Sequence, residues 1–407
     1  MIRFVTLLLL SVALAAPALA QRVPERPVIL IGIDGFRADY LDRGLTPTLS
    51  RLANEGAVAQ GGMRPSFPSV TYPNFYTLVT GLHPDHHGLV YNRMRDPGLP
   101  GRTFSLGDRH EVMDPVWWND GEPIWVTAER AGLSTAVLFW PGSEAAVRGQ
   151  RPRDWLPFEQ SVSSRARVNI TLGWFTTPEG DWPDFAAVYF DIVDTRGHLY
   201  GPQSPELNEA LVEVDQAVAL LIDGLSARGI QANLVIVADH GMAATSGERI
   251  VWLDDWIAAE AVDSFTYGPL AFVDPLPGRE AELEAALSRE VDGLSCWRRE
   301  DIPARFAYGS HRRISRVVCL TRMGWTLGVR GQTDPARVRP GTHGFDPDAP
   351  EMQAAFIAWG PSIRSGTRLA GVNSVDVQPM LARLLGIAAP EGDGQTAATA
   401  PAIRTGP

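Results

Sequence analysis

Three short segments of the 407-residue chain place a histidine beside a glycine, and two of them add an aspartate. The segments are Asp194–His198, Asp239–Gly241 and His343–Gly344, and they contain three of the eight histidines. Neutral imidazoles and carboxylates are the side chains that bind zinc and similar divalent ions. Because the segments lie far apart in the chain, they predict a metal site that the fold assembles.

The expected strands place such residues at one edge of a sheet. Val28–Ile33, Ala186–Ile192 and Asn233–Ala238 are apolar runs typical of buried strands. These runs lead, in order, to Asp34, Asp194 and Asp239. Helical patterns separate them, which predicts an α/β fold with a largely parallel sheet and helices on both faces. Ligands bind such sheets at the carboxyl edge of the strands.

The candidate ligands exceed the needs of one tetrahedral zinc ion. They are Asp34, Asp194, His198, Asp239, His240 and His343. Such a set suits two metal ions, and two ions roughly 3.5–4 Å apart stabilise the attacking and leaving oxygens of a displacement at phosphorus. A second cluster, His83, His86 and His87, is not expected to bind metal because the set is complete without it.

A hydroxyl side chain precedes an expected helix in the segment Pro68–Tyr76. Pro73 suits the first turn of a helix toward Gly81, which puts Thr71 at the positive end, where oxyanions are stabilised. Contact with a metal ion would lower the pKa of the hydroxyl and make Thr71 a nucleophile. The alternative is that Thr71 only caps the helix, and the local pattern by itself favours the cap.

Residues 1–20 have the pattern of a signal peptide, with a basic start, a short apolar run and a small-residue cleavage site at Ala20. An uncleaved anchor is the alternative. No later stretch is apolar enough to span a bilayer, so we expect a soluble, periplasmic or secreted protein without stable membrane insertion. In that oxidising compartment a Cys296–Cys319 disulfide is favoured over two buried free thiols, although the sequence does not show their separation.

We expect residues 21–389 to form one catalytic domain, with an inserted subdomain or cap at about 246–340 that contains a charged helix near Arg279–Val291. Residues 390–407 are rich in alanine, proline, threonine and glycine, which is typical of a disordered tail. Near the start of the domain, Thr46 is expected to cap a helix from Pro47 to about Glu55.

The net charge of −11 argues against duplex nucleic acid as a partner. A small anionic substrate is still compatible with this charge, because metal ions reverse the local field inside a cleft.

Taken together, these residues resemble the nucleotide pyrophosphatase/phosphodiesterase family within the alkaline phosphatase superfamily. The resemblance runs from about Val28 to Leu385 and is specific because the motifs occur in combination. The motifs are Gly32–Gly35, Phe67–Asn74, Asn92 before Met94, Tyr189 ahead of Asp194–His198, Asp239–Gly241 and His343–Gly344. One departure is Asp191–Val193, where the family usually carries two acidic residues and a proline.

The resemblance implies an alkaline-phosphatase-like fold and two Zn²⁺ per chain. One zinc would be held by Asp34, Asp239 and His240, with the oxygen of Thr71 bridging toward it. The other would be held by Asp194, His198 and His343. Thr71 would be the nucleophile, Asn92 would bind phosphate, and Tyr72 and Tyr189 would sandwich a base.

The implied activity is hydrolysis of phosphodiester and pyrophosphate bonds in small-molecule nucleotides, releasing nucleoside 5′-monophosphates through a covalent threonine intermediate. The alternatives are a phospholipid-headgroup phosphodiesterase acting on lysophospholipid or choline esters, a monoesterase or sulfatase of the same superfamily, and a non-catalytic exported metal-binding protein. The nucleophile motif shows no obvious arginine for the third oxygen of a phosphate monoester, and Thr71–Pro73 stands where a sulfatase needs a cysteine or serine.

Overall fold

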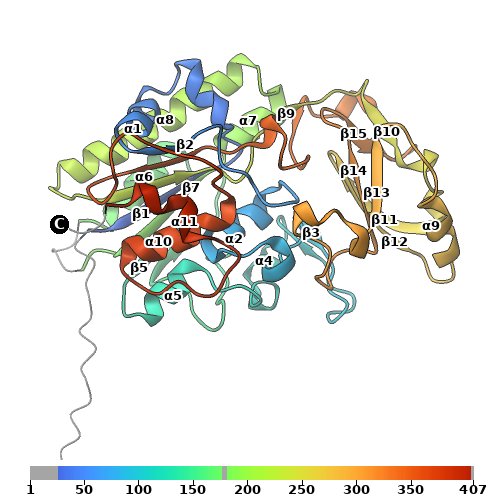
Figure 1. The fold of residues 1–407 in the computed structure, drawn as a ribbon, viewed down its shortest axis with the longest axis horizontal. Coiled ribbons are helices and arrows are strands. Elements are labelled where there is room, and N and C mark those ends of the chain that lie inside the picture. The colour runs from blue at the N-terminus through green and yellow to red at the C-terminus, as the bar shows by residue number, and fades with distance from the viewer. Residues whose placement is uncertain (1–25, 177–180, 405–407) are drawn as a thin grey trace, which may run out of the picture.

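The computed structural model describes residues 26–176 and 181–404, so the expected signal peptide lies outside the described residues. An eight-stranded sheet in the order β18-β2-β17-β8-β1-β7-β5-β6 forms the centre of the larger part of the molecule (Figure 1). The strands are β1 Val28–Ile33, β2 Ala57–Ala59, β5 Thr135–Leu138, β6 Asp154–Leu156, β7 Phe185–Phe190, β8 Asn233–Val237, β17 Phe356–Trp359 and β18 Thr367–Leu369. The sheet is parallel except at β17, which runs antiparallel to both of its neighbours.

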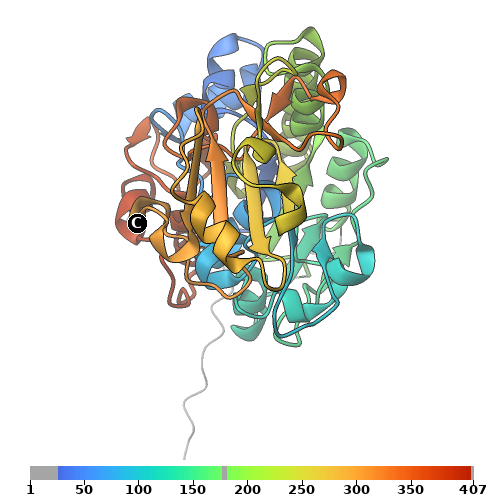
Figure 2. The same cartoon turned by 90° about the vertical axis from the view of Figure 1, so that its right-hand side faces the viewer.

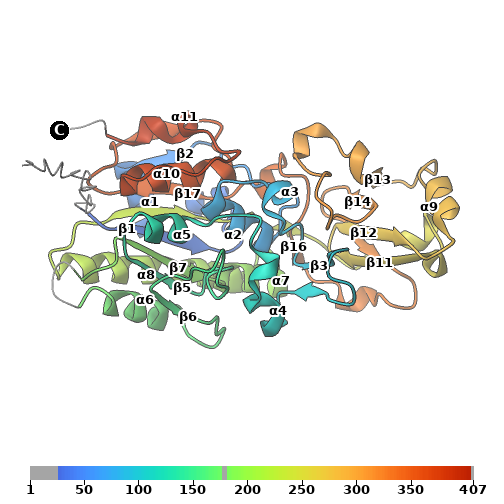
Figure 3. The same cartoon turned by 90° about the horizontal axis from the view of Figure 1, so that it is seen from below.

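Helices cover both faces of this sheet (Figures 1 and 3). The helices of one face are α1 Pro47–Glu55, α6 Ser164–Gly173 and α8 Pro205–Ser226. Those of the other face are α2 Thr71–Thr80, α5 Ile124–Arg130 and α10 Val377–Leu385. All residues of β1, β7 and β8 are buried, because apolar side chains of these strands pack under helices on both sides. The α/β fold with a largely parallel sheet is therefore confirmed.

Residues between β8 and β17 form a smaller lobe with its own sheet, which faces the viewer in Figure 2. This antiparallel sheet has the order β11-β12-β14-β13. Its strands are β11 Val262–Tyr267, β12 Leu270–Pro275, β13 Leu294–Arg298 and β14 Val317–Thr321. A separate apolar cluster lies beneath it, and the short parallel pair of β10 Ile250–Trp252 and β15 Thr326–Gly328 extends the lobe.

Two expectations for this lobe can be compared with the structure. Cys296 on β13 lies opposite Cys319 on β14, and the two form a disulfide. The charged helix is shorter than predicted: α9 spans Glu280–Ala286, and the chain then turns through Gly293, whose φ is +77°, into β13. That left-handed conformation suits glycine. Val291 is not helical and instead forms an isolated antiparallel bridge with Leu294 across this turn.

The expectation of a disordered tail is wrong for residues 390–404. Helix α11 Thr396–Thr399 lies there, and Thr399, Ala402 and Ile403 are buried. The carboxylate of Asp393 accepts a hydrogen bond from the His83 backbone N–H at 2.7 Å. Small side chains let this segment pack closely on the domain, so low apolar content did not mean low burial. Residues 405–407 lie outside the described residues.

Helix α1 begins at Pro47 as predicted, but Thr46 does not cap it through its side chain. The buried carboxylate of Asp215, on α8, instead accepts hydrogen bonds from the backbone N–H groups of Thr48 and Leu49 at 3.1 and 2.8 Å. Thr46 Oγ1 is buried and has no hydrogen-bond partner among the described residues. A contact between helices, which no local pattern shows, therefore satisfies this helix start.

We expect Asp215→Ala to lower the free energy of unfolding by about 2 kcal/mol, because it removes two hydrogen bonds to an ionised group. The matched control is Thr46→Val, which keeps the shape of the side chain and removes only the unpaired hydroxyl. That change should leave stability unchanged or raise it slightly. Urea denaturation of both variants measures the difference. A loss in Thr46→Val as large as that in Asp215→Ala would contradict the assignment of the cap to Asp215 alone.

No helix among the described residues combines the length and apolar character needed to cross a membrane.

Candidate active site

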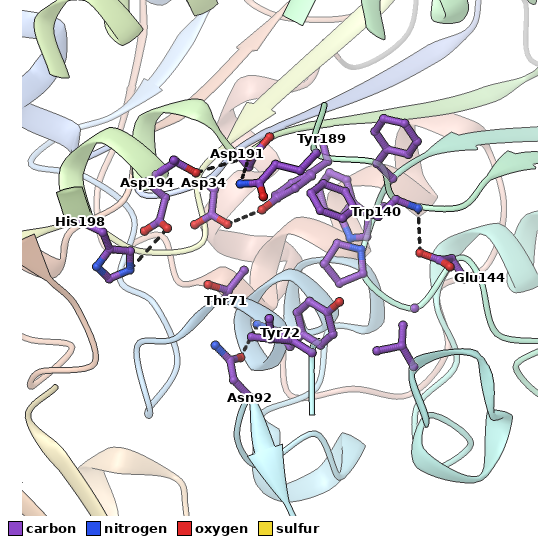
Figure 4. A pocket seen from close by; sticks show the side chains of 18 of the residues that line it. Asp34, Thr71, Tyr72, Asn92, Trp140, Glu144, Tyr189, Asp191, Asp194 and His198 are labelled. Carbon is purple, nitrogen blue, oxygen red and sulfur yellow. Dashed lines mark hydrogen bonds and ion pairs between the residues drawn. The ribbon is translucent and has the colours of Figure 1, made fainter. Parts of the chain in front are cut away.

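The carboxyl edge of the central sheet brings together side chains from distant parts of the chain. Asp34 follows β1, Asp239 and His240 follow β8, and Asp194 lies in the first turn of α7 Ile192–Tyr200. His343 follows the short strand β16 Gly341–Thr342. Figure 4 shows Asp34, Asp194 and His198 directed toward one region in front of Thr71.

These side chains form the two groups of three that the family resemblance implies. One consists of Asp34, Asp239 and His240, and the other of Asp194, His198 and His343. Within each group the ligating atoms lie within 4.8 Å of one another. The rings of His240 and His343 stack with centroids 3.6 Å apart, so the two groups are adjacent.

Backbone carbonyls fix the orientation of all three imidazoles. Nδ1 of His198 lies 2.9 Å from the carbonyl oxygen of Gly341, and Nδ1 of His240 lies 2.9 Å from that of Gly241. Nδ1 of His343 lies 2.9 Å from the carbonyl oxygen of Ser69. A proton on each Nδ1 leaves each Nε2 with a lone pair directed at the carboxylates, which is the arrangement that metal-binding histidines adopt.

The glycines of the histidine segments allow the backbone to approach closely. A Cβ on Gly241 would lie 2.1 Å from the carbonyl oxygen of Glu351. Gly344 has a φ of +100°, which L side chains rarely adopt. Any larger residue at these positions would displace His240 or His343, which explains the pairing of histidine with glycine in the sequence.

Individual oxygens of the carboxylates in the site lack hydrogen-bond partners although they are buried. Asp34 Oδ1 and Asp194 Oδ1 are buried and accept no hydrogen bond from the described residues. Burial raises the pKa of Asp34 well above its ordinary range, and the charges of Asp239 and Asp194 raise it further. Burial also raises the pKa of Asp194. Cations bound to the two groups would neutralise these charges, so the donor set fits the two metal ions predicted from the sequence.

Thr71 lies beside the first of these groups. It is the first residue of α2, and its Oγ1 lies 3.4 Å from Nε2 of His240. The helix is preceded by Val70 as N-cap, and no side chain caps it. The reading of Thr71 as a capping residue is therefore wrong, and its hydroxyl is directed at the metal-type side chains at the positive end of the helix.

Asn92 lies near the same helix end. Its Oδ1 accepts a hydrogen bond from the Tyr72 N–H at 2.9 Å (Figure 4). Since Oδ1 is occupied, Nδ2 is the atom that Asn92 can offer to a ligand in the pocket it lines.

A pocket of about 350 Å³ extends from the donor groups along aromatic side chains. Tyr72 lines it and is only partly buried. Tyr189 also lines it, but this side chain is 7 % exposed and its hydroxyl donates a 2.5 Å hydrogen bond to Asp34 Oδ2. The Tyr189 ring packs edge-on against Phe75 and Phe158. This geometry does not favour the stacking role expected for Tyr189. The ring is enclosed, and its hydroxyl is hydrogen-bonded to Asp34, one of the candidate metal ligands.

Phe158 is a pocket residue that the sequence did not single out. It follows β6, lines the pocket and is partly buried. Its backbone N–H donates to the Glu144 carboxylate at 2.9 Å, which fixes this part of the loop. A lone aromatic residue after a short strand has no local feature that separates a pocket residue from a core residue.

The clustered histidines His83, His86 and His87 are bonded to protein atoms. His83 Nδ1 lies 2.9 Å from the hydroxyl of Ser66, and His86 pairs with Asp393 at 2.8 Å. His87 is buried, with Nε2 3.0 Å from the hydroxyl of Thr77. The two candidate metal groups found among the described residues do not include this cluster.

The chain matches the model of the type I phosphodiesterase/nucleotide pyrophosphatase family over residues 28–346. It is 37% identical over 384 residues to an uncharacterized pyrophosphatase/phosphodiesterase of Schizosaccharomyces pombe, covering 91% of this chain and 79% of that protein. It is 33% identical over 393 residues to human ectonucleotide pyrophosphatase/phosphodiesterase family member 5, covering 95% and 81%.

A solved structure of murine family member 5, an inactive threonine-to-alanine variant in complex with AMP, superimposes with a TM-score of 0.87. The identity is 31%, and the match covers 93% of this chain and all of that one. The fold and site define a hydrolase of alkaline-phosphatase-like architecture. The chain belongs to the type I phosphodiesterase/nucleotide pyrophosphatase family.

Proposed function

We propose that this protein is a two-zinc nucleotide pyrophosphatase/phosphodiesterase that releases nucleoside 5′-monophosphates through a covalent threonine intermediate. The observation that carries the proposal is the placement of Thr71 Oγ1 at a helix start, 3.4 Å from His240 and beside two groups of three metal-type ligands. The murine relative in complex with AMP supports a nucleotide ligand.

The two groups would hold zinc, because imidazole and carboxylate donors in three-ligand sets suit zinc better than magnesium or calcium. Bound zinc would supply positive charge that lowers the pKa of the Thr71 hydroxyl and offsets charge on the phosphoryl oxygens.

The reaction would proceed in two displacements. The Thr71 oxygen bonds to phosphorus while the bond from phosphorus to the leaving oxygen breaks, and the hydroxyl proton passes to solvent. Water then adds at phosphorus from the side that the leaving group vacated. The bond from Thr71 to phosphorus breaks, and the threonine recovers a proton. Two inversions at phosphorus give net retention.

A diester has only two unesterified phosphoryl oxygens, so a neutral donor suffices where a monoester needs a further cation. Asn92 Nδ2 and the backbone N–H of Thr71, the first residue of α2, would donate to one of these oxygens. The nucleoside would occupy the aromatic end of the pocket. Tyr72 and Phe158 offer partly buried rings there, and we assign the stacking role to this pair instead of Tyr189.

Two observations support the proposal that the enzyme acts outside the cytoplasm. The Cys296–Cys319 disulfide suits an oxidising compartment. The human relative is named as an ectonucleotide enzyme.

A substrate panel tests the proposal: an aryl ester of a nucleoside 5′-monophosphate, a dinucleotide, a lysophospholipid and a phosphate monoester. We expect hydrolysis of the first two with nucleoside 5′-monophosphate as product. Preference for the lysophospholipid would instead assign the pocket to a phospholipid headgroup, and preference for the monoester would make the protein a phosphatase.

The same assay, with a base-free aryl diester added, tests the stacking pair. Tyr72→Ala and Phe158→Ala should each lower kcat/KM for the nucleotide ester about 10- to 100-fold more than for the base-free diester. The matched control is Tyr189→Phe, which should lower both values equally because it removes only the hydrogen bond to Asp34. Equal losses on both substrates in the two alanine variants would contradict a base slot between Tyr72 and Phe158.

A further inference from the structure

The pocket is chemically different at its two ends. In Figure 4, Trp140 and Glu144 lie on one side of Thr71, whereas Asp194 and His198 lie on the other. The first end is largely aromatic. The second end is formed by α7, whose residues Thr195, His198 and Leu199 line the pocket. Arg339 also lines the pocket, and the chain that follows it packs on this helix, since a Cβ on Gly341 would lie 2.1 Å from the carbonyl oxygen of Gly197. No other arginine of the described residues lines this pocket.

Arg339 is held at the pocket through its backbone. It lies between the short helix Pro335–Arg337 and strand β16, and its carbonyl oxygen accepts a 2.7 Å hydrogen bond from the Thr245 hydroxyl. The next residue, Pro340, accepts from the Thr245 N–H at 3.0 Å. Two bonds to one threonine fix the chain immediately before the metal-type residue His343.

The guanidinium of Arg339 has no assigned role within the protein. The side chain is exposed, and within residues 26–176 and 181–404 it makes no hydrogen bond or ion pair. Most of the other charged side chains that line the pocket have partners within the protein. For example, Asp191 forms an ion pair with Arg167 at 2.7 Å. An arginine that lines a pocket without a protein partner is available to a ligand, and guanidinium binds phosphate through paired hydrogen bonds.

The geometry of the proposed displacement identifies which part of the ligand reaches Arg339. The attacking oxygen of Thr71 lies beside the group of Asp34, Asp239 and His240. In an in-line displacement the leaving group departs on the side opposite the attacking oxygen, here the side of the second donor group. Because the nucleoside fills the aromatic end, the leaving group extends past His198 toward Arg339.

We propose that Arg339 is a specificity-determining residue that binds the phosphate of a phosphorylated leaving group. It would thereby favour pyrophosphate-bond substrates, whose leaving group is pyrophosphate or a nucleotide, over esters whose leaving group carries no phosphate. This inference rests on the proposed function of the site. In the step concerned, the bond between the α-phosphorus and the bridging oxygen breaks, and the electron pair leaves with the phosphate that Arg339 contacts.

The test compares two substrates with the same nucleoside: a nucleoside triphosphate and a 4-nitrophenyl ester of the nucleoside 5′-monophosphate. Arg339→Gln should lower kcat/KM for the triphosphate by about 10- to 100-fold and leave the aryl ester within about twofold. Arg339→Lys should recover part of the loss. The matched control is Arg337→Gln, because Arg337 is a strongly exposed arginine on the same segment that faces Asp334 at 3.6 Å.

Equal losses on both substrates, or no loss on either, would overturn the role of Arg339 while the proposed function stands. A loss of bound zinc in Arg339→Gln, measured by elemental analysis, would also overturn it, because the residue would then support the metal site. If the unmodified protein hydrolyses neither substrate, the proposed function fails and this inference fails with it.

Discussion

Replacing Thr71 with alanine should lower kcat/KM for nucleotide diesters by about 10³-fold or more while leaving the fold intact. The reason is that the nucleophile is removed from a site whose donor groups remain in place. Thr71 makes no capping hydrogen bond, so the change should cost little stability. Steady-state kinetics and thermal unfolding of the same preparation measure the two effects.

Thr71→Ser is the matched control, because it keeps a hydroxyl at the start of α2. It should retain far more activity than the alanine variant. The covalent route can be checked separately with a chiral phosphorothioate diester, for which two displacements require net retention at phosphorus. Inversion, or an alanine variant with nearly full activity, would rule out the threonine as nucleophile.

Removal of metal should abolish activity, and zinc should restore it where magnesium and calcium do not. The physical reason is that Asp34, Asp194 and Asp239 gather carboxylate charge in a buried site, and that the group beside the Thr71 hydroxyl, His240, belongs to the same donor set. Chelation followed by titration with each ion, with kcat and bound metal measured at every step, tests this expectation.

A variant can show which donors hold the ions. Asp194→Asn should reduce bound zinc from about two ions per chain to about one. Asp191→Asn is the matched control, since Asp191 lines the same pocket, pairs with Arg167 and belongs to neither donor group. Its zinc content should stay unchanged. Full activity of a protein with no detectable transition metal would overturn the metal assignment.

The inner strands of the central sheet were predictable because each is a local feature of the sequence, whereas the short strands β2, β6 and β18 were not predicted. Val28–Ile33 is β1 as predicted, and Asn233–Val237 differs from the predicted strand by one residue. Asp34, Asp194, Asp239 and His240 were predictable for a related reason: residues that follow parallel strands meet at one edge whatever lies between them. His198 lies on α7 and His343 follows β16, outside that sheet, so this argument does not place them. The antiparallel direction of β17 could not be predicted, because the pattern of apolar residues in a strand does not depend on the direction in which the strand runs.

Other features depended on contacts between residues far apart in the chain. The Asp215 carboxylate accepts hydrogen bonds from backbone N–H groups at the start of α1. Residues 390–404 are ordered by the domain surface on which they pack. The role of Thr71 was also undecided locally, because a threonine before a helix caps it in most settings. Only the approach of His240, from a strand end far along the chain, directs that hydroxyl at the donor groups.

The aromatic residues show the same division. The sequence contains Tyr72, Phe158 and Tyr189, but it does not indicate which rings border empty space. The fold encloses Tyr189 against Phe75 and turns its hydroxyl to Asp34, whereas Phe158 is left at the pocket. The sequence by itself determined which chemical groups the protein has and which sheet edge holds them. Their partners were decided by the tertiary structure, because hydrogen bonds and ring contacts depend on distances that only packing sets.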